Sequence, residues 1–409
     1  MSGLDTTIRD DALAFVAEGA DSMRAETIAL AEINSGSYHA AGVNRVREAL
    51  AALFDDLGAE SSVLPSPPLE VLDDDGALRE RALGDGLRLR KRPDAPFQVF
   101  LCGHMDTVFP ADHPFQAVRE IDGDTLGGPG VADLKGGLVL MHRALLALER
   151  SPLAEKIGWE VLLNPDEEIG SPVSAPWIRE AAERADVGLI YEPSFPDGSL
   201  AGRRKGSGNF ALLARGRAAH AGREHHLGRN AIRLLSEALV AIDDLNGQRP
   251  GVTFNPGFVH GGGAVNIVPD TAVGRFNIRV EEPEDTAWCE QELAAIIDAL
   301  NARDGLSLEL HGGFTRPPKV PGPANERLFD LARDCGASLG VDLAVKPTGG
   351  CCDGNNLAAA GVPNIDTLGV HGGNIHSSDE WMRVSSLVER GQLSALLLLR
   401  LAAGDWSPT

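Results

Sequence analysis

Hydrophobic and polar positions along the chain follow patterns that predict an α/β fold. Apolar residues recur at helical spacing over residues 8–33 and 43–57, and both segments are predicted to be helices. Residues 60–95 alternate short apolar pieces with turn sequences, which is typical of edge strands. The uninterrupted apolar runs that are typical of buried strands cover residues 97–102, 159–163 and 187–191. We therefore expect a sheet flanked by helices.

Each of these buried strands is followed by a histidine or by carboxylates. His104 and Asp106 follow the first strand, Glu167 and Glu168 the second, and Glu192 the third. Reactive groups are expected at the carboxyl ends of strands in an open α/β sheet. The pattern therefore indicates a chemical site at this end of the sheet.

Several of these residues also have a plain structural interpretation. Glu167 and Glu168 repel each other, so a strand end that holds both needs a nearby cation, unless the segment is a solvated acidic turn. Asp133 precedes a predicted helix, where it is either a helix N-cap or a metal ligand. Together with His104, Glu192 and a distant segment that contains His371 and His376, these carboxylates form a ligand set that suits zinc, cobalt or manganese.

A separate unit is predicted between the two halves of this fold. Its elements follow the order strand, helix, strand, strand, helix, strand, which is a ferredoxin-like plan. The predicted elements are residues 209–215, 230–242, 252–259, 271–280, 285–301 and 306–310. We expect a mixed-sheet catalytic domain in two parts, residues 1–203 and 316–409, with an inserted α+β lid or dimerisation domain at residues 204–315.

Composition and charge narrow the class of partner. The formal net charge of −22 gives no basic stripe for phosphates, so a nucleic-acid partner is not expected. No apolar run of signal-peptide or membrane-spanning length is present, so no membrane partner is expected either. Five cysteines, an odd number without metal-ligand spacing, fit a reducing compartment and predict a cytoplasmic protein. Cys351 and Cys352 are interpreted as small packing residues.

Six short motifs, in this order along nearly the whole chain, resemble those of a family of di-zinc metallopeptidases. The family includes glutamate carboxypeptidase, aminoacylase, succinyl-diaminopimelate desuccinylase and acetylornithine deacetylase. The motifs are His104-Met105-Asp106-Thr107-Val108, Gly130 to Gly137 around Asp133, Asp166-Glu167-Glu168, Glu192-Pro193, Ala219-His220-Ala221-Gly222 and Ile375-His376-Ser377. Lys205-Gly206 and Gly349-Gly350 resemble glutamate carboxypeptidase most, although the loop from Cys351 to Asn355 departs from its pattern.

The resemblance implies a role for each candidate at the metal site. Asp133 would bridge two Zn²⁺ ions, with Co²⁺ or Mn²⁺ as alternatives. His104 and Glu192 would complete one metal site, and Glu168 and His376 the other. Glu167 would be the general base that takes a proton from the attacking water. Asp106 would orient His104. The family also has a cis peptide bond, which would lie here between Asp133 and Leu134.

Four residues of the lid are similar to substrate-binding or catalytic residues of the family. His220 matches a histidine that reaches the partner's active site in family dimers, and its alternative is a capping or core histidine. Arg279 matches the residue that holds the substrate α-carboxylate, with a surface ion pair as the alternative. Asn266 matches a neighbour of that subsite. Lys205 resembles a basic residue near it, and its alternative is a solvated hinge charge.

These observations predict a zinc-dependent hydrolase that cleaves a peptide or N-acyl bond to a C-terminal amino acid, with glutamate as the expected residue. The substrate would be a small molecule or short peptide with a free carboxylate. A deacylase or desuccinylase is the nearer alternative, and an inactive ligand-binding relative is the alternative of another class. A homodimer through the lid is expected from His220.

Overall fold

A six-stranded mixed sheet forms the centre of the catalytic domain in the computed structural model, which describes residues 4–408. In spatial order its strands are β1 (Glu60–Leu64), β4 (Gly86–Lys91), β8 (Gly158–Asn164), β5 (Gln98–His104), β9 (Val187–Ile190) and β18 (Asn364–Ile365). The four strands from β8 to β18 are parallel, so their carboxyl ends meet at one edge. In β5, Val99 and Leu101 face one core, whereas Phe100 and Cys102 face another.

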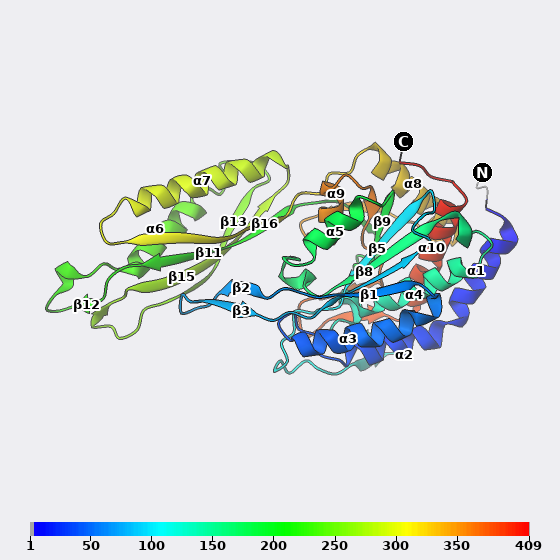
Figure 1. Cartoon of the computed structure of the whole chain (residues 1–409), viewed down its shortest axis with the longest axis horizontal. Coiled ribbons are helices and arrows are strands. Elements are labelled where there is room, and N and C mark those ends of the chain that lie inside the picture. Colours follow the sequence, from blue (N-terminus) through cyan, green and yellow to red (C-terminus); the bar gives the residue numbers. More distant parts are fainter. Residues whose placement is uncertain (1–3, 409) are drawn as a thin grey trace.

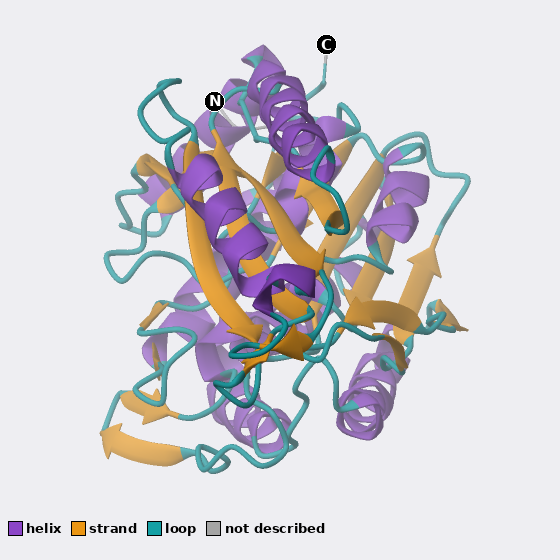
Figure 2. Ribbon diagram, turned by 90° about the vertical axis from the view of Figure 1, so that its left-hand side faces the viewer, coloured by secondary structure: helices purple, strands orange, loops and turns teal. Residues whose placement is uncertain are grey.

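Helices cover both faces of this sheet (Figure 2). The larger core includes residues of α1 (Thr6–Glu18), α2 (Ala20–Ala31), α3 (Ala40–Leu53), α4 (Gly136–Glu149), α8 (Pro323–Ser338) and α10 (Ser385–Ala402). The smaller core includes residues of α5 (Ala175–Ala182) and α9 (Asp353–Ala359). The prediction of one helix over residues 8–33 is wrong, because α1 ends and α2 begins at Gly19. A Cβ at Gly19 would lie 2.4 Å from Arg143 Nε, so this side chain fills the break.

The lid domain has the predicted ferredoxin-like order and its own core. Its elements are β11 (Gly206–Arg215), α6 (Ala231–Asp243), β13 (Thr253–Gly261), β15 (Thr271–Val280), α7 (Glu284–Asn301) and β16 (Ser307–Arg316). The sheet is antiparallel, with the spatial order β13-β15-β11-β16, and α6 and α7 pack on one face. In Figure 1 the lid extends away from the catalytic domain, and the short strands β12 (Ala219–His220) and β14 (Ile267–Val268) pair near its far tip.

A hairpin of the catalytic domain reaches across to the lid (Figure 1). It consists of β2 (Leu69–Leu72) and β3 (Leu78–Arg81). Arg275 of the lid donates a 2.9 Å hydrogen bond to the carbonyl oxygen of Leu72 and forms a 2.7 Å ion pair with Asp74. Leu72 also packs with Leu213 and Val273 of the lid sheet. The hairpin therefore links the two domains in addition to the two chain crossings.

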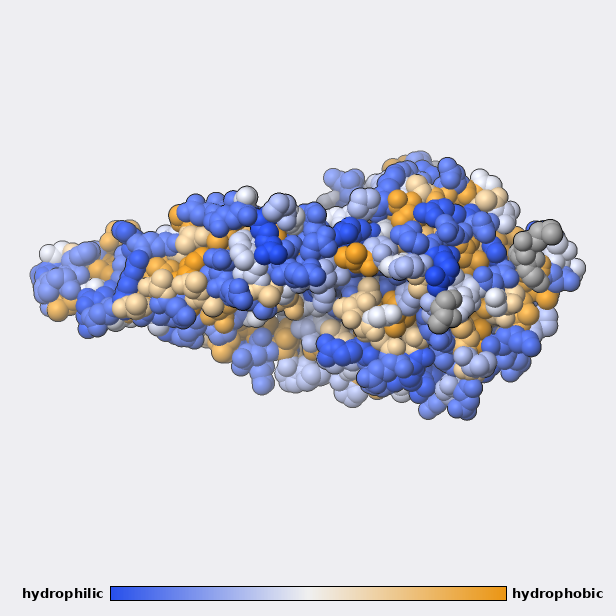
Figure 3. All heavy atoms as spheres, turned by 90° about the horizontal axis from the view of Figure 1, so that it is seen from above, coloured by the Kyte–Doolittle hydropathy of each residue, from blue (hydrophilic) through white to orange (hydrophobic). Residues whose placement is uncertain are grey.

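The remaining strands form two small sheets of the catalytic domain, in the spatial orders β10-β17 and β19-β20-β7-β6. They are β6 (Arg119–Asp122), β7 (Thr125–Gly127), β10 (Leu200–Arg204), β17 (Val345–Thr348), β19 (Gly372–Gly373) and β20 (Trp381–Arg383). The face seen in Figure 3 is mostly hydrophilic over both domains, in keeping with the formal charge of −22. None of the helices within residues 4–408 has the length and hydrophobicity that crossing a membrane requires.

Candidate metal centre and active site

The five predicted metal ligands converge at the carboxyl edge of the central sheet. His104 Nε2 lies 3.0 Å from Asp133 Oδ1, and His376 Nε2 lies 3.3 Å from Asp133 Oδ2. His376 Nε2 is also 3.0 Å from Glu168 Oε2, and His104 Nε2 is 3.9 Å from Glu192 Oε2. Asp133 therefore stands between two groups, each with one histidine and one further carboxylate.

Strand order explains this convergence. His104 ends β5, and Glu168 and Glu192 follow β8 and β9, which are the two neighbours of β5 in the sheet. Asp133 lies in the turn Val131–Lys135 before α4, and the N-cap of α4 is Lys135, so Asp133 is not its N-cap. His376 comes from the loop between β19 and β20 and has a positive φ of 64°. Three parallel strands and two loops thus supply the cluster.

The donor set fits a pair of divalent cations. In a tetrahedral site with bonds of about 2.0–2.1 Å, ligand atoms on one zinc ion lie about 3.3 Å apart. The contacts of the two histidines with Asp133 and Glu168, at 3.0–3.3 Å, match this spacing. Two histidines and three carboxylates also suit zinc, cobalt or manganese by ligand type.

Electrostatics point to the same need for positive charge. Burial, and then the Asp133 charge, raises the pKa of Glu168 to about 8. Burial also raises the pKa of Glu192 well above its ordinary value. Hydrogen bonds to Asp133 and Glu168 raise the pKa of His376 to about 11. Burial lowers the pKa of His104, but hydrogen bonds to Asp106 and Asp133 outweigh burial, so this pKa lies well above its ordinary value. Without a cation, histidine protons must balance the carboxylates, and bound metal ions would take over that role.

Asp106 connects His104 to the loop that contains Glu167 and Glu168. His104 Nδ1 lies 3.0 Å from the backbone oxygen of Asp106 and 3.4 Å from its carboxylate. The same carboxylate accepts hydrogen bonds from the backbone N–H of Glu167 at 3.1 Å and of Glu168 at 3.2 Å, and from Ser37 Oγ at 2.6 Å. Asp106 therefore fixes the position of the loop as well as that of His104.

Glu380 holds the Asp133 turn, a contact that sequence reasoning missed. Its carboxylate accepts hydrogen bonds from the backbone N–H groups of Gly130 at 3.0 Å, Ala132 at 3.0 Å and Asp133 at 3.1 Å. No motif pointed to Glu380, because it lies 247 residues from Asp133 in the chain. The peptide bond between Asp133 and Leu134 is cis, as the resemblance implied.

Glu167 lies beside the ligands and is paired with a buried arginine. Arg316 Nη2 lies 2.7 Å from Glu167 Oε1 and also donates to the Glu167 backbone oxygen at 2.7 Å. Burial raises the pKa of Glu167 to about 6, although Arg316 opposes this rise. Glu167 also lies within ligand distance of His104 and Glu192, so it too has access to a metal ion. Sequence reasoning missed the pairing with Arg316, which gives Glu167 a cationic partner of its own.

Arg279 reaches the same cavity from the lid. A cavity of about 470 Å³ is lined by Asp133, Glu167 and Arg279, among other residues. Arg279 Nε donates to Asn277 Oδ1 at 2.8 Å, and its Nη1 lies 3.0 Å from the sulfur of Cys351. The interpretation of Cys351 as a packing residue is therefore incomplete, since its thiol contacts the guanidinium that was predicted to bind a carboxylate.

The other three lid candidates are not among the residues that line this cavity. Lys205 forms a 3.0 Å ion pair with Glu281, which is the geometry of the hinge-charge alternative. His220 is exposed on β12, and its Nδ1 accepts hydrogen bonds from the N–H groups of Gly222 at 3.1 Å and Arg223 at 3.2 Å. Asn266 is also exposed, and its backbone oxygen accepts from Ala221 N. His220 and Asn266 thus lie on paired segments near the tip of the lid.

Comparison with known proteins gives consistent relatives. Residues 100–400 match the model of peptidase family M20/M25/M40. Carboxypeptidase G2 from Pseudomonas sp. (strain RS-16) is 29% identical over 383 residues, which cover 92% of this chain and 88% of that protein. A succinyl-diaminopimelate desuccinylase from Bordetella parapertussis is 30% identical over 333 residues, which cover 76% of this chain and 85% of that protein.

Solved structures share the fold over more than nine-tenths of the chain. Human carnosine dipeptidase 1 has a TM-score of 0.74 at 15% identity, with 96% of this chain and 99% of that chain covered. A metallo-carboxypeptidase of the M20 family from Sulfolobus solfataricus has a TM-score of 0.72 at 16% identity, with 93% and 99% covered. The family match spans most of the chain, including all five residues that meet at Asp133. The chain therefore belongs to peptidase family M20/M25/M40, a family of metal-dependent hydrolases.

Proposed function

We propose that this protein cleaves the amide bond between an acyl or peptidyl group and a C-terminal amino acid, with glutamate as the expected residue. The observation that carries the proposal is the shared cavity, in which Arg279 of the lid faces Glu167 and the ligand cluster of the catalytic domain. A guanidinium suits a carboxylate, and a metal-ligand cluster beside a further glutamate suits amide hydrolysis. The name of the carboxypeptidase relative agrees with this substrate class.

The residues of the cluster divide into two metal sites in this proposal. Asp133 would contribute one oxygen to each of two Zn²⁺ ions, with Co²⁺ or Mn²⁺ as alternatives. His104 and Glu192 would complete one site, and Glu168 and His376 the other. The contacts of Asp133 with both histidines, at 3.0 and 3.3 Å, support this division.

Side chains of the protein would transfer the proton of the attacking water and hold the group that accepts it. Bound divalent cations would supply Lewis-acid polarisation and lower the pKa of water. Glu167 would accept the proton of the attacking water and deliver it to the leaving nitrogen, because its carboxylate lines the catalytic cavity beside the ligand cluster. Arg316 would hold the Glu167 carboxylate in place through the 2.7 Å contact. Asp106 would hold the backbone of the same loop.

Substrate specificity would depend on the lid. Arg279 would bind the free carboxylate of the C-terminal residue in competition with its contact to Cys351. His220 and Asn266, exposed near the tip of the lid, would act on the site of a second copy in a homodimer. A cytoplasmic location and the domain boundaries at residues 204 and 315 stay predictions.

Substrate screening tests the proposal. Zinc-loaded protein is assayed with N-acyl amino acids and dipeptides that differ in the C-terminal residue, and the release of free amino acid is measured. We expect turnover with a preference for glutamate or aspartate and none with C-terminal amides. Binding of these compounds without hydrolysis of any would instead support an inactive ligand-binding relative.

A deacylase or desuccinylase activity is the second candidate. It is favoured by relatives named succinyl-diaminopimelate desuccinylase, one of which is 32% identical over 264 residues. The same screen separates the two candidates when succinyl and acetyl diamino acids are included. Preferred hydrolysis of these compounds over acyl-glutamates would assign the protein to the second class.

A further inference from the structure

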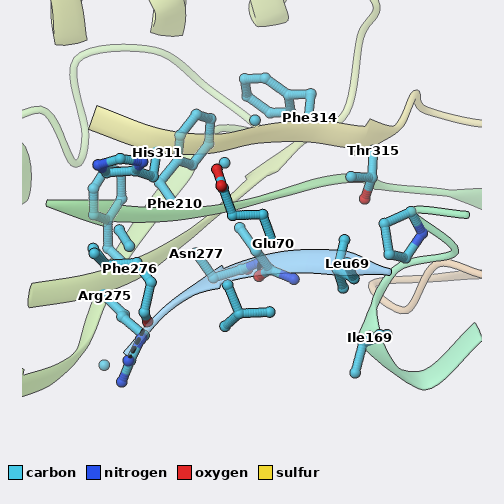
Figure 4. A pocket seen from close by; sticks show the side chains of 18 of the residues that line it. Leu69, Glu70, Ile169, Phe210, Arg275, Phe276, Asn277, His311, Phe314 and Thr315 are labelled. Carbon is cyan, nitrogen blue, oxygen red and sulfur yellow. Dashed lines mark hydrogen bonds between the residues drawn. The ribbon is translucent and has the colours of Figure 1, made fainter. Parts of the chain in front are cut away.

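A second cavity, of about 610 Å³, lies between the lid sheet and the β2–β3 hairpin (Figure 4). Leu69 and Val71 of the hairpin form one wall. Ile169 and Pro172, from the loop that follows the catalytic glutamates, form another. The lid supplies a third wall that includes Phe314. We call this cavity the hairpin groove.

The hairpin groove continues from the catalytic cavity. Asn209 of β11 lines both cavities. In the lid sheet Arg279 pairs with Ser207, Asn277 pairs with Asn209, and Arg275 pairs with Ala211. Arg279 and Ser207 line the catalytic cavity, whereas Asn277, Arg275 and Ala211 line the groove. One face of the lid thus runs from the carboxylate-binding position into the groove.

The loop of the catalytic domain shows the same continuity. Gly170 lines the catalytic cavity, and Ile169 beside it lines the hairpin groove. Ile169 directly follows Glu168 in the chain. A substrate whose scissile bond lies at Glu167 and Glu168 therefore has the groove within reach on the Ile169 side of the loop.

The walls of the groove are largely apolar, and a few polar side chains also line it. His311 has a buried Nε2 without a hydrogen-bond partner among the described residues. Figure 4 shows the Glu70 side chain directed from the hairpin into the groove, on the side of Phe210 and His311. Glu309 Oε2 lies 3.9 Å from His311 Nε2, beyond hydrogen-bond distance. A ring nitrogen with no hydrogen bond, among apolar walls, suits a ligand that carries both an apolar body and a polar group.

We propose that the hairpin groove is the subsite for the acyl group of the substrate and that it selects bulky, mainly apolar acyl groups over acetyl. The inference rests on the proposed function, because Arg279 must hold the free carboxylate. With the carboxylate at Arg279, the acyl group extends away from it along the lid face. Arg275 lies four residues further along β15, about 13 Å at the usual rise per strand residue. An acetyl group is too short to fill this length.

The hairpin makes the groove a fixed feature rather than a gap between mobile domains. Arg275 binds Leu72 and Asp74, Arg215 donates to the carbonyl oxygen of Gly76 at 3.1 Å, and His260 Nδ1 lies 2.9 Å from the backbone oxygen of Asp74. These contacts hold the β2–β3 roof on the lid. The width of the groove, and with it the size of the acyl group, is therefore set by the hairpin.

Filling the groove tests the inference. Gly313 lines it, and a Cβ at this position meets no atom within 4 Å, so Gly313→Phe places a ring in the groove without a clash at Cβ. Gly123, an exposed turn residue between β6 and β7, has the same open space, and Gly123→Phe is the matched control. Thermal melting of all three proteins checks that they are folded.

The measured quantity is the ratio of kcat/KM for N-benzoyl- or N-octanoyl-glutamate to that for N-acetyl-glutamate. We expect a ratio of at least about 10 for the natural protein, a fall of about tenfold or more in Gly313→Phe, and no change in Gly123→Phe. Equal kcat/KM for the acetyl and the bulky substrates, or an unchanged ratio in folded Gly313→Phe, would overturn the inference. Failure of the proposed function is distinct, because no acyl-glutamate would then be hydrolysed.

Discussion

The candidate metal centre and the proposed substrate-binding surface of the lid are assembled in different ways. At the metal centre, side chains from three parallel strands and two loops meet within 3.0 to 3.9 Å contacts. On the lid, Arg279 reaches the cavity, whereas His220 and Asn266 lie exposed near the opposite end of the domain. A single chain therefore supplies all five predicted metal ligands to the cluster, but it does not bring all the predicted substrate-binding residues to it.

This difference separates chemistry from recognition. The ligand cluster depends on strand order in a buried sheet that belongs to the catalytic domain alone. In our proposals, substrate recognition depends on the lid, on the hairpin that is bound to it and on a second copy of the chain. Changes at the centre should remove turnover for every substrate, whereas changes on the lid should alter which substrate is used.

The largest effect is expected at the centre. Glu167→Gln removes the proposed general base but keeps the shape of the side chain, so kcat should fall by about 10²–10⁴ while bound metal is retained. Steady-state kinetics and elemental analysis measure the two quantities. Glu183→Gln, at an exposed position, is the matched control. Near-full turnover by metal-loaded Glu167→Gln would contradict the assigned mechanism.

His220→Ala should lower kcat by about 10²–10³ if this histidine stabilises the oxyanion in the partner's site. The exposed His226→Ala in the same domain should have no such effect. Mixing His220→Ala with Glu167→Gln should restore about a quarter of the natural activity, because half of the dimers are mixed and each has one complete site. A fully active monomer in sedimentation would exclude this role.

A smaller, substrate-dependent effect is expected at Arg279. A hydrogen bond to a charged group contributes about 1.5–3 kcal/mol, so Arg279→Ala should reduce kcat/KM for acyl-glutamates by about 10–150-fold, mainly through KM. Inhibition by free glutamate should weaken in parallel. Arg333→Ala, on the surface of α8, is the control. An unchanged KM would show that the carboxylate binds elsewhere.

The smallest effect on maximal turnover is expected at Glu380. Glu380→Gln weakens the three backbone hydrogen bonds that hold the Asp133 turn, so metal affinity should fall by about 10–100-fold. Competition with a chelator measures the affinity, and excess zinc should restore most of the rate. Glu326→Gln in α8 is the control. A loss that excess metal does not restore would place Glu380 in the reaction itself.

Local sequence patterns predicted the fold elements and the resemblance pointed to the cluster. Period-two and helical spacing identified five of the six lid elements to within three residues, because each element buries one face in its own core. The sixth prediction, residues 306–310, stops six residues short, because β16 continues to Arg316. Three of the predicted ligands, His104, Glu168 and Glu192, lie at or just after the ends of buried strands, where a histidine or a carboxylate stands out from the apolar sequence before it. The break at Gly19 escaped notice, because it depends on the packing of Arg143 from a different helix.

Contacts between distant segments could not be predicted in the same way. Glu380 and Arg316 carry no local motif, and their roles appear only when the loops that they hold are in place. Residues 60–95 were predicted to form edge strands and turns, which is wrong for β4, because it pairs with β1 on one side and β8 on the other. The docking of the β2–β3 hairpin on Leu213 and Val273 of the lid depends on the relative position of two domains. The hairpin groove could not be predicted for the same reason, because its walls come from both domains.

The most direct test of the account is a metal titration of chelator-stripped protein with acyl-glutamate as substrate. The account predicts that turnover rises with added zinc and reaches its plateau at two metal ions per chain, and that Asp133→Asn binds zinc weakly and stays inactive. Full turnover in the presence of chelator with no metal bound, or a plateau unaffected by Asp133→Asn, would contradict it.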